Sequence, residues 1–161
     1  MVKVNRKEDE PMKEGYVDNC FASLYYKEMG QGMPLIMLHG NGESHEIFAR
    51  LSELMSRYYR VILMDSRGHG SSLMKGEAAR GELTIPDMAA DVVQVMEFLH
   101  VPRAVILGFS DGANVALETA SCYPGRVSAV VAVSGNALPR GMSTASVSYT
   151  HLRAHETAAN L

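Results

Sequence analysis

Short, uninterrupted apolar runs alternate along this chain with segments in which apolar residues recur every three or four positions. The continuous runs occupy residues 34–38, 60–64, 104–107 and 127–133. Runs of this length indicate strands buried on both faces of a sheet. The helical spacing occurs at Ile47, Leu51, Leu54 and Met55, at Met88, Val92, Met96 and Leu99, and along residues 113–120. Strands that alternate with helices predict an α/β fold with a mostly parallel, doubly wound sheet.

Local signals set the borders of these elements. We expect Ser44 to cap the first helix and Thr84 to cap the second, since each is a hydroxyl residue just ahead of an apolar stripe. Residues 16–19 and 22–29 predict an antiparallel hairpin at the edge of the sheet. Residues 75–82 are polar and punctuated by glycine, which predicts a surface loop.

Three polar loops follow the expected strands. They read His-Gly-Asn-Gly-Glu-Ser at residues 39–44, Asp-Ser-Arg-Gly-His-Gly-Ser-Ser at 65–72, and Gly-Phe-Ser-Asp-Gly at 108–112. The carboxyl ends of parallel strands meet at one edge of a sheet, where ligands bind in folds of this class. The sequence therefore predicts that the three loops converge on one site.

The last of these loops has the pattern Gly-x-Ser-x-Gly between a strand and a helix. A turn this sharp holds its central residue, Ser110, in a strained backbone conformation. Gly108 and Gly112 lack the Cβ atoms that would collide with neighbouring elements. The expected result is a serine hydroxyl raised above the sheet at the start of a helix, where developing negative charge is favoured.

Together, the three loops resemble those of the α/β-hydrolase superfamily, in order and in spacing, over roughly residues 15–140. The resemblance implies a hydrolytic or acyl-transfer enzyme with Ser110 as nucleophile. It also implies an oxyanion hole formed by the backbone N–H groups of Asn41 and Asp111. The residues that would shape this site are His39, Gly40, Gly42, Gly108, Phe109 and Gly112. A small-molecule substrate is expected, with no metal and no cofactor.

The family pattern also needs a carboxylate and a histidine after the serine. The later candidates are His151, His155 and Glu156. They lie in residues 147–161, a segment that resembles the in-frame translation of a sequencing-library adapter, so we expect it to take no part in the fold. We expect the natural part of this chain to stop near Ser146, where the adapter-like segment begins.

We expect the chain to have three parts: a mobile N-terminus at residues 1–14, a partial α/β-hydrolase core at 15–140, and a non-native or disordered tail at 141–161. The lid, the last strands and the triad's acid and histidine are expected to be missing. A chain in this form is expected to have negligible turnover and marginal stability.

The earlier histidines are poor candidates for the catalytic base. His39 and His69 are expected to be loop residues bonded to backbone, and His100 lies at the opposite end of the sheet. His45 is expected to be exposed in a first helical turn. We expect Arg67 to bond backbone carbonyls within a structural corner.

Composition narrows the class of protein. The 161 residues carry a net charge of −3, which argues against nucleic acid or an anionic membrane as partner. The charged N-terminus does not resemble a signal peptide, and no apolar stretch approaches the roughly 20 residues of a membrane span. Cys20 and Cys122 fit a reduced, cytoplasmic protein better than a disulfide scaffold.

The favoured function is hydrolysis of a small carboxylic ester, lactone or related carbonyl compound through an acyl-enzyme. Two alternatives stay open: a non-catalytic binding protein or receptor on the same fold, and a carbon–carbon bond hydrolase. Dehalogenase relatives carry Asp at the elbow, where this chain has Ser110. A dinucleotide site starting at Gly40 is disfavoured because His45 stands where glycine or alanine is needed. The oligomeric state is left open.

Overall fold

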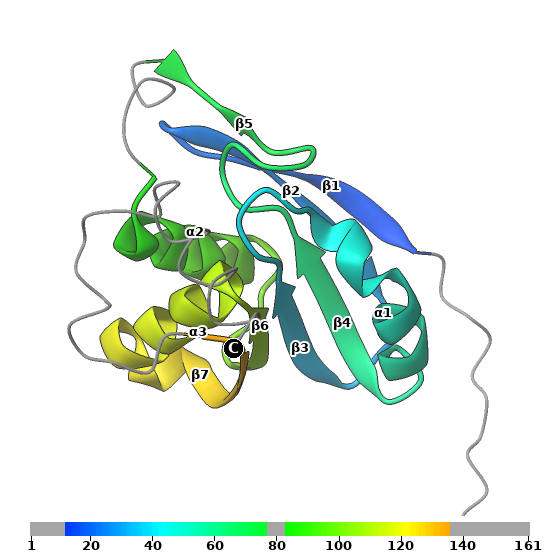
Figure 1. Cartoon of the computed structure of the whole chain (residues 1–161). Helices are drawn as coiled ribbons and strands as arrows, with labels where there is room; N and C mark the ends of the chain where they lie inside the picture. Colours follow the sequence, from blue (N-terminus) through cyan, green and yellow to red (C-terminus); the bar gives the residue numbers. More distant parts are fainter. Residues whose placement is uncertain (1–11, 77–82, 136–161) are drawn as a thin grey trace, which may run out of the picture.

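A computed structural model describes residues 12–76 and 83–135 of the chain (Figure 1). The strands are β1 (Lys13–Asp18), β2 (Ala22–Met29), β3 (Met33–Leu38), β4 (Tyr59–Met64), β5 (Leu73–Met74), β6 (Ala104–Phe109) and β7 (Val127–Val133). The helices are η1 (His45–Phe48), α1 (Ala49–Met55), α2 (Ile85–Phe98), α3 (Asp111–Cys122) and η3 (Pro124–Arg126). Our expectations for residues 1–11, 77–82 and 136–161, including the adapter-like segment, lie outside the described residues.

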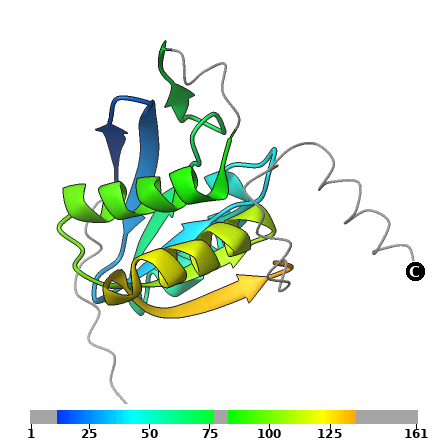
Figure 2. The same cartoon turned by 90° about the vertical axis from the view of Figure 1, so that its left-hand side faces the viewer.

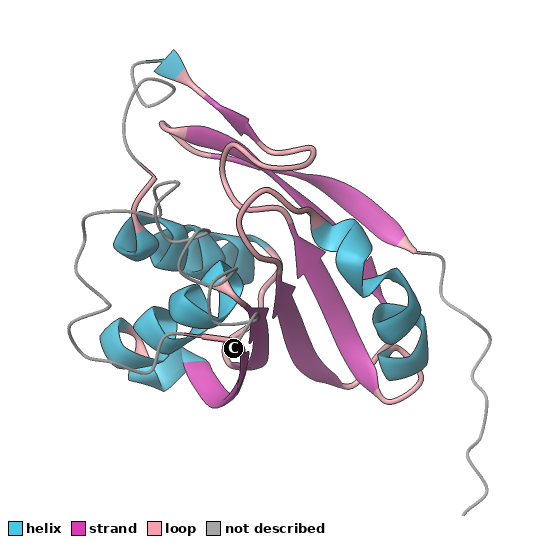
Figure 3. Ribbon diagram, in the orientation of Figure 1, coloured by secondary structure: helices cyan, strands magenta, loops and turns pink. Residues whose placement is uncertain are grey.

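The described strands form one seven-stranded sheet in the order β1-β2-β4-β3-β6-β7, with β5 paired to β2 (Figure 3). The pairs β4–β3, β3–β6 and β6–β7 are parallel, whereas β1–β2 and β2–β4 are antiparallel. The expected fold class, a mostly parallel sheet with an antiparallel N-terminal hairpin, is confirmed. Strand β1 begins at Lys13, so the border that we expected after residue 14 falls inside it.

Helices cover both faces of the sheet, as expected for a doubly wound fold. Helices α2 and α3 lie side by side on one face (Figure 2). Ile36 and Leu38 of β3 join the core on that side. Leu35 and Met37, which alternate with them, pack with Phe48 on the opposite face. Strands β3 and β4 therefore bury both sets of side chains, which explains why each reads as a continuous apolar run. Strand β7, the last in the order of the described sheet, also reads as such a run, but most of its side chains are exposed.

Helix α2 forms as its sequence predicts. The Thr84 hydroxyl accepts a hydrogen bond from the backbone N–H of Asp87 at 3.2 Å, which satisfies one of the unpaired donors of the first turn. Met88, Val92 and Met96 are buried in the core, and Leu99 packs against it. The expected cap and stripe are both confirmed.

Helix α1 buries a different face from the one predicted. Ser44 caps η1 as expected, but Ile47, Leu51 and Leu54 are all exposed. The sheet instead receives Phe48 and Ser52, which are buried and spaced like a second helical stripe. An aromatic ring buries more apolar area than an aliphatic side chain, and the small Ser52 lets the helix approach closely. Met55 of the predicted stripe does pack against this side of the core. The expectation was wrong for Ile47, Leu51 and Leu54, because two adjacent stripes compete on this helix.

The loop after β4 is tied to α2 by a buried ion pair. Nε and Nη2 of Arg67 donate to the Asp91 carboxylate at 2.6 and 2.8 Å, and Nη2 also donates to the Asp87 carbonyl at 3.2 Å. Burial raises the pKa of Asp91, and the hydrogen bonds from Arg67 oppose this effect. The expectation that Arg67 bonds backbone carbonyls is therefore correct for one contact, while its main partner is a carboxylate.

Candidate active site

The turn between β6 and α3 holds Ser110 in a conformation that L-residues rarely adopt, with φ of 54° and ψ of −117°. A non-glycine residue in such a region costs about 1–3 kcal/mol and persists only where its surroundings enforce it. Here the backbone N–H of Ser110 donates to the Val133 carbonyl at 2.8 Å, and its carbonyl accepts from Ala113 at 2.9 Å. The elbow geometry expected from the sequence is present.

The flanking glycines are required by close backbone contacts. A Cβ on Gly108 would lie 2.1 Å from the Gly112 carbonyl oxygen, and one on Gly112 would lie 2.1 Å from the Leu38 carbonyl oxygen. A Cβ on Gly40 would lie 3.1 Å from Cβ of Ser110. The start of α3 therefore packs directly on the end of β3, and this contact brings the loop after β3 against the serine.

A small pocket opens at this junction. Its lining includes five of the predicted site residues, together with side chains from the loop after β4 and from α2 and α3: His39, Gly40, Asn41, Ser66, His69, Met88, Asp111, Gly112 and Val115. Ser110 is not among the lining residues, but its Cβ lies 3.1 Å from the position that a Cβ on Gly40, which lines the pocket, would take. Phe109 points to the other side of the sheet, where it packs with the cluster beneath α1. Gly42 has a φ of +72° and no atom within 4 Å of its Cβ position, so its role is in the turn.

His39 is buried and bonded to backbone on both sides of its ring. Nδ1 lies 2.7 Å from the Gly40 carbonyl, and Nε2 accepts from the backbone N–H of Ser66 at 3.0 Å. A carbonyl can only accept, so Nδ1 carries the proton and Nε2 carries none. Burial lowers the pKa of His39, which agrees with this neutral form. His39 thus joins the loops after β3 and β4.

The buried His39 predicts a pH dependence of stability. The unfolded chain takes up a proton near pH 6.5, whereas the folded chain resists it, so stability falls as the pH drops below about 6.5. The slope contributed by one such group reaches at most about 1.4 kcal/mol per pH unit. Urea unfolding between pH 7.5 and 5 checks this slope. His39→Gln keeps an acceptor for Ser66 but does not titrate, and it should show a shallower dependence. Equal slopes for the two proteins would contradict the assignment.

His69 and His45 each have defined partners. Nδ1 of His69 lies 3.1 Å from the Arg67 carbonyl, and Nε2 lies 3.0 Å from Oδ1 of Asn41. His69 therefore contacts the side chain of the residue whose N–H is expected to form the oxyanion hole.

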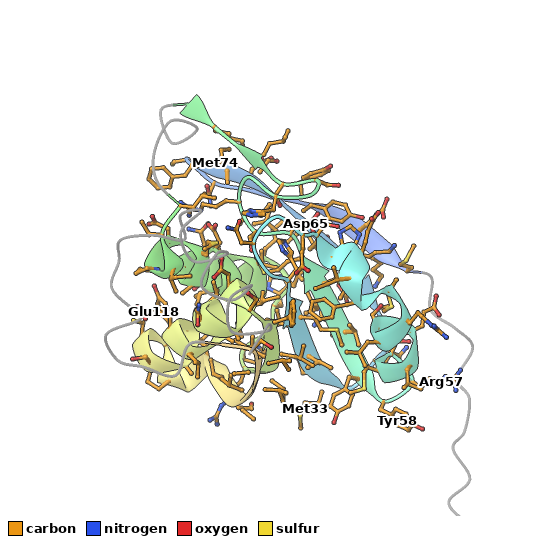
Figure 4. The ribbon with its side chains drawn as sticks, viewed as in Figure 1. Met33, Arg57, Tyr58, Asp65, Met74 and Glu118 are labelled. Atoms are coloured by element: carbon orange, nitrogen blue, oxygen red, sulfur yellow. The ribbon has the colours of Figure 1, made fainter. Side chains whose placement is uncertain are left out.

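The side chain of His45 is only 13% exposed, and its Nδ1 lies 3.0 Å from Oδ1 of Asp65. Our expectation of an exposed His45 was wrong because Asp65, fully buried at the end of β4, also binds the backbone N–H groups of His45 and Ser71. Figure 4 shows Asp65 at the carboxyl end of the strands, away from Met33 and Tyr58 at the other edge.

Glu43 is a residue of the loop after β3 that the sequence patterns did not single out. Its Oε2 accepts a hydrogen bond from the backbone N–H of Gly40 at 2.9 Å, and its own N–H donates to the Gly40 carbonyl at 3.3 Å. A carboxylate three residues after a glycine in a tight loop is the signal that could have suggested this contact.

Within residues 12–76 and 83–135, no group of three or more His, Cys, Asp or Glu side chains is arranged to hold a metal ion. No helix in the same part of the chain is long and apolar enough to cross a membrane.

Comparisons with known proteins agree with the fold. The model of the alpha/beta hydrolase fold family matches residues 33–154. The match extends into residues 147–161, whose foreign origin stays a prediction. The pimeloyl-[acyl-carrier protein] methyl ester esterase of Aliivibrio fischeri (strain MJ11) is 33% identical over 115 residues, which cover 71% of this chain and 41% of that protein.

Two solved structures are similar. One is Est816, described as an N-acyl homoserine lactone degrading enzyme, with a TM-score of 0.69, 32% identity, and coverage of 74% of this chain and 45% of that one. The other is a hydrolase from Pseudomonas aeruginosa PA01, with a TM-score of 0.71, 26% identity, and coverage of 80% and 49%. The chain spans less than half the length of each of these three relatives. With the family model matching most of its length, the chain belongs to the alpha/beta hydrolase fold family.

Proposed function

We propose that the whole protein is a serine hydrolase of small carboxylic esters, lactones or related carbonyl compounds. The observation that carries this proposal is the strained Ser110, held between β6 and α3 and in contact with Gly40. Among the relatives, one is named as a methyl ester esterase and another as an enzyme that degrades acyl homoserine lactones. The first name states an ester substrate, and the second states a substrate that contains a cyclic ester.

In the proposed mechanism, the Ser110 hydroxyl attacks the substrate carbonyl carbon and displaces the alcohol, leaving an acyl-enzyme that water then hydrolyses. The carbonyl oxygen becomes negative during the attack. We assign its stabilisation to the backbone N–H groups of Asn41 and Asp111, two residues that line the same pocket. Backbone donors are fixed before the reaction and do not reorganise as charge develops, and each contributes on the order of 3 kcal/mol.

The general base is not assigned to His39 or His69. Both ring nitrogens of His39 are bonded to backbone, and those of His69 lie against Arg67 and Asn41. A base must reach the serine proton with a free ring nitrogen, so these histidines serve to hold the loops in place.

A fluorophosphonate probe tests the proposal, because it reacts only with a serine activated as a nucleophile. We expect the whole protein to acquire one adduct, located on Ser110 by peptide mapping, and an excess of ester substrate to slow the labelling. Ser134 is an internal control, since it shares a positive φ of 57° at the end of β7 and should remain unlabelled. If a known hydrolase is labelled alongside while this protein is not, a non-catalytic binding role replaces the enzyme proposal.

A further inference from the structure

The carboxylate of Glu43 lies beside the expected nucleophile. If Gly40 had a Cβ atom, that atom would lie 2.7 Å from Oε2 of Glu43 and 3.1 Å from Cβ of Ser110. The acid and the serine are therefore near neighbours on one side of Gly40. The hydrogen bond from the Gly40 N–H, at 2.9 Å, holds Oε2 in that position.

Within residues 12–76 and 83–135, the pocket beside Ser110 is lined by an acid, Asp111, and by no lysine or arginine that could offset the charge of Glu43. The arginine of the loop after β4, Arg67, is paired with Asp91. A substrate that brings a negative charge near the reacting carbonyl would thus meet a carboxylate at short range, where the Coulomb interaction is strongest.

We propose that Glu43 is a specificity-determining residue, which disfavours anionic substrates at Ser110 and favours neutral or cationic ones. This inference rests on the proposed hydrolase function for its biological meaning. The selected class would be esters or lactones without a carboxylate or phosphate next to the scissile bond. The Glu43 carboxylate thus has two roles: its hydrogen bond from Gly40 holds the loop, and its negative charge acts on the substrate.

The electrostatic part can be measured in the present 161-residue chain without any turnover. Cys20 and Cys122, both exposed, are replaced by serine, and Ser110→Cys places a single thiol at the elbow. The reaction rates of this thiol with a cationic and an anionic methanethiosulfonate reagent are then compared. Their ratio cancels changes in the reactivity of the thiol itself, because both reagents attack the same sulfur.

Glu43→Gln removes the charge and keeps an oxygen that can accept from Gly40. A unit charge acting at about 6 Å in a water-like medium changes each rate about threefold, so the cation-to-anion ratio should fall about tenfold. The matched control is Glu97→Gln, which removes the same charge from an exposed site at the C-terminal end of α2. It should leave the ratio unchanged. The effect of Glu43 should also shrink at 0.5 M salt, where screening is strong.

An unchanged ratio in Glu43→Gln would overturn the proposal. In the protein that keeps Glu43, a cation-to-anion ratio equal to that of free N-acetylcysteine at low salt would also overturn the proposal. This measurement does not use the Glu43→Gln variant, so it does not depend on how that variant folds. If Glu43→Gln lowers the cation-to-anion ratio as expected while the fluorophosphonate fails to label the whole protein, the proposed hydrolase function is contradicted. The charge effect of Glu43 is still supported in that case.

Discussion

Replacing Ser110 with alanine should lower kcat of the whole protein on an ester substrate by about 10⁴- to 10⁶-fold. The acyl-enzyme route needs the Oγ atom, and without it only oxyanion stabilisation and substrate binding remain. In free energy this is a loss of about 5–8 kcal/mol of transition-state stabilisation. Initial-rate kinetics with a chromogenic ester measure the effect directly.

The same variant should fold normally. The Ser110 side chain does not cap α3, and alanine tolerates the strained turn about as well as serine does. We therefore expect the free energy of unfolding to change by less than about 1 kcal/mol. Ser71→Ala is a matched control on the same edge of the sheet. Ser71 binds Asp65 through its backbone N–H, so removal of its hydroxyl leaves that hydrogen bond in place. Retention of more than a tenth of the activity in Ser110→Ala would remove the serine from the mechanism.

Sequence patterns could place the three site loops because each follows a continuous apolar strand. The runs at residues 34–38 and 60–64 differ from β3 and β4 by one residue each, and the run at 104–107 begins where β6 begins. A strand buried on both faces has few alternatives to its register, so its carboxyl end is also determined. The Gly-x-Ser-x-Gly turn could be predicted for a similar reason, since close backbone contacts leave no space for Cβ atoms at Gly108 and Gly112.

The polar contacts within the loops could not be predicted in this way. Periodicity describes burial, but it does not say that Glu43 turns back to the Gly40 N–H or that Asp65 binds His45. Those contacts depend on turn conformation, which several sequences can adopt. The face of α1 was missed for a different reason. The choice between Ile47 and Phe48 depends on the shape of the sheet below, and a single sequence does not reveal this shape.

Replacing Gly112 with alanine should destabilise the fold by about 4 kcal/mol or more. In a free helix the change would be favourable by about 1 kcal/mol, since alanine is the better helix former. Here the new Cβ would lie 2.1 Å from the carbonyl oxygen of Leu38 and 2.6 Å from that of His39. Both atoms belong to the backbone at the end of β3, which is paired on both sides in the sheet and cannot move away. The start of α3 must shift instead, and it carries the N–H of Asp111 with it.

Gly125→Ala is the matched control, because a Cβ at Gly125 would meet no atom within 4 Å. Urea unfolding should show a large loss of stability for Gly112→Ala and a change below about 1 kcal/mol for Gly125→Ala. If Gly112→Ala proved as stable as the parent chain, helix propensity would have outweighed the clash. The close packing of α3 on β3 would then be wrong, and with it the contact that brings Gly40 against the serine.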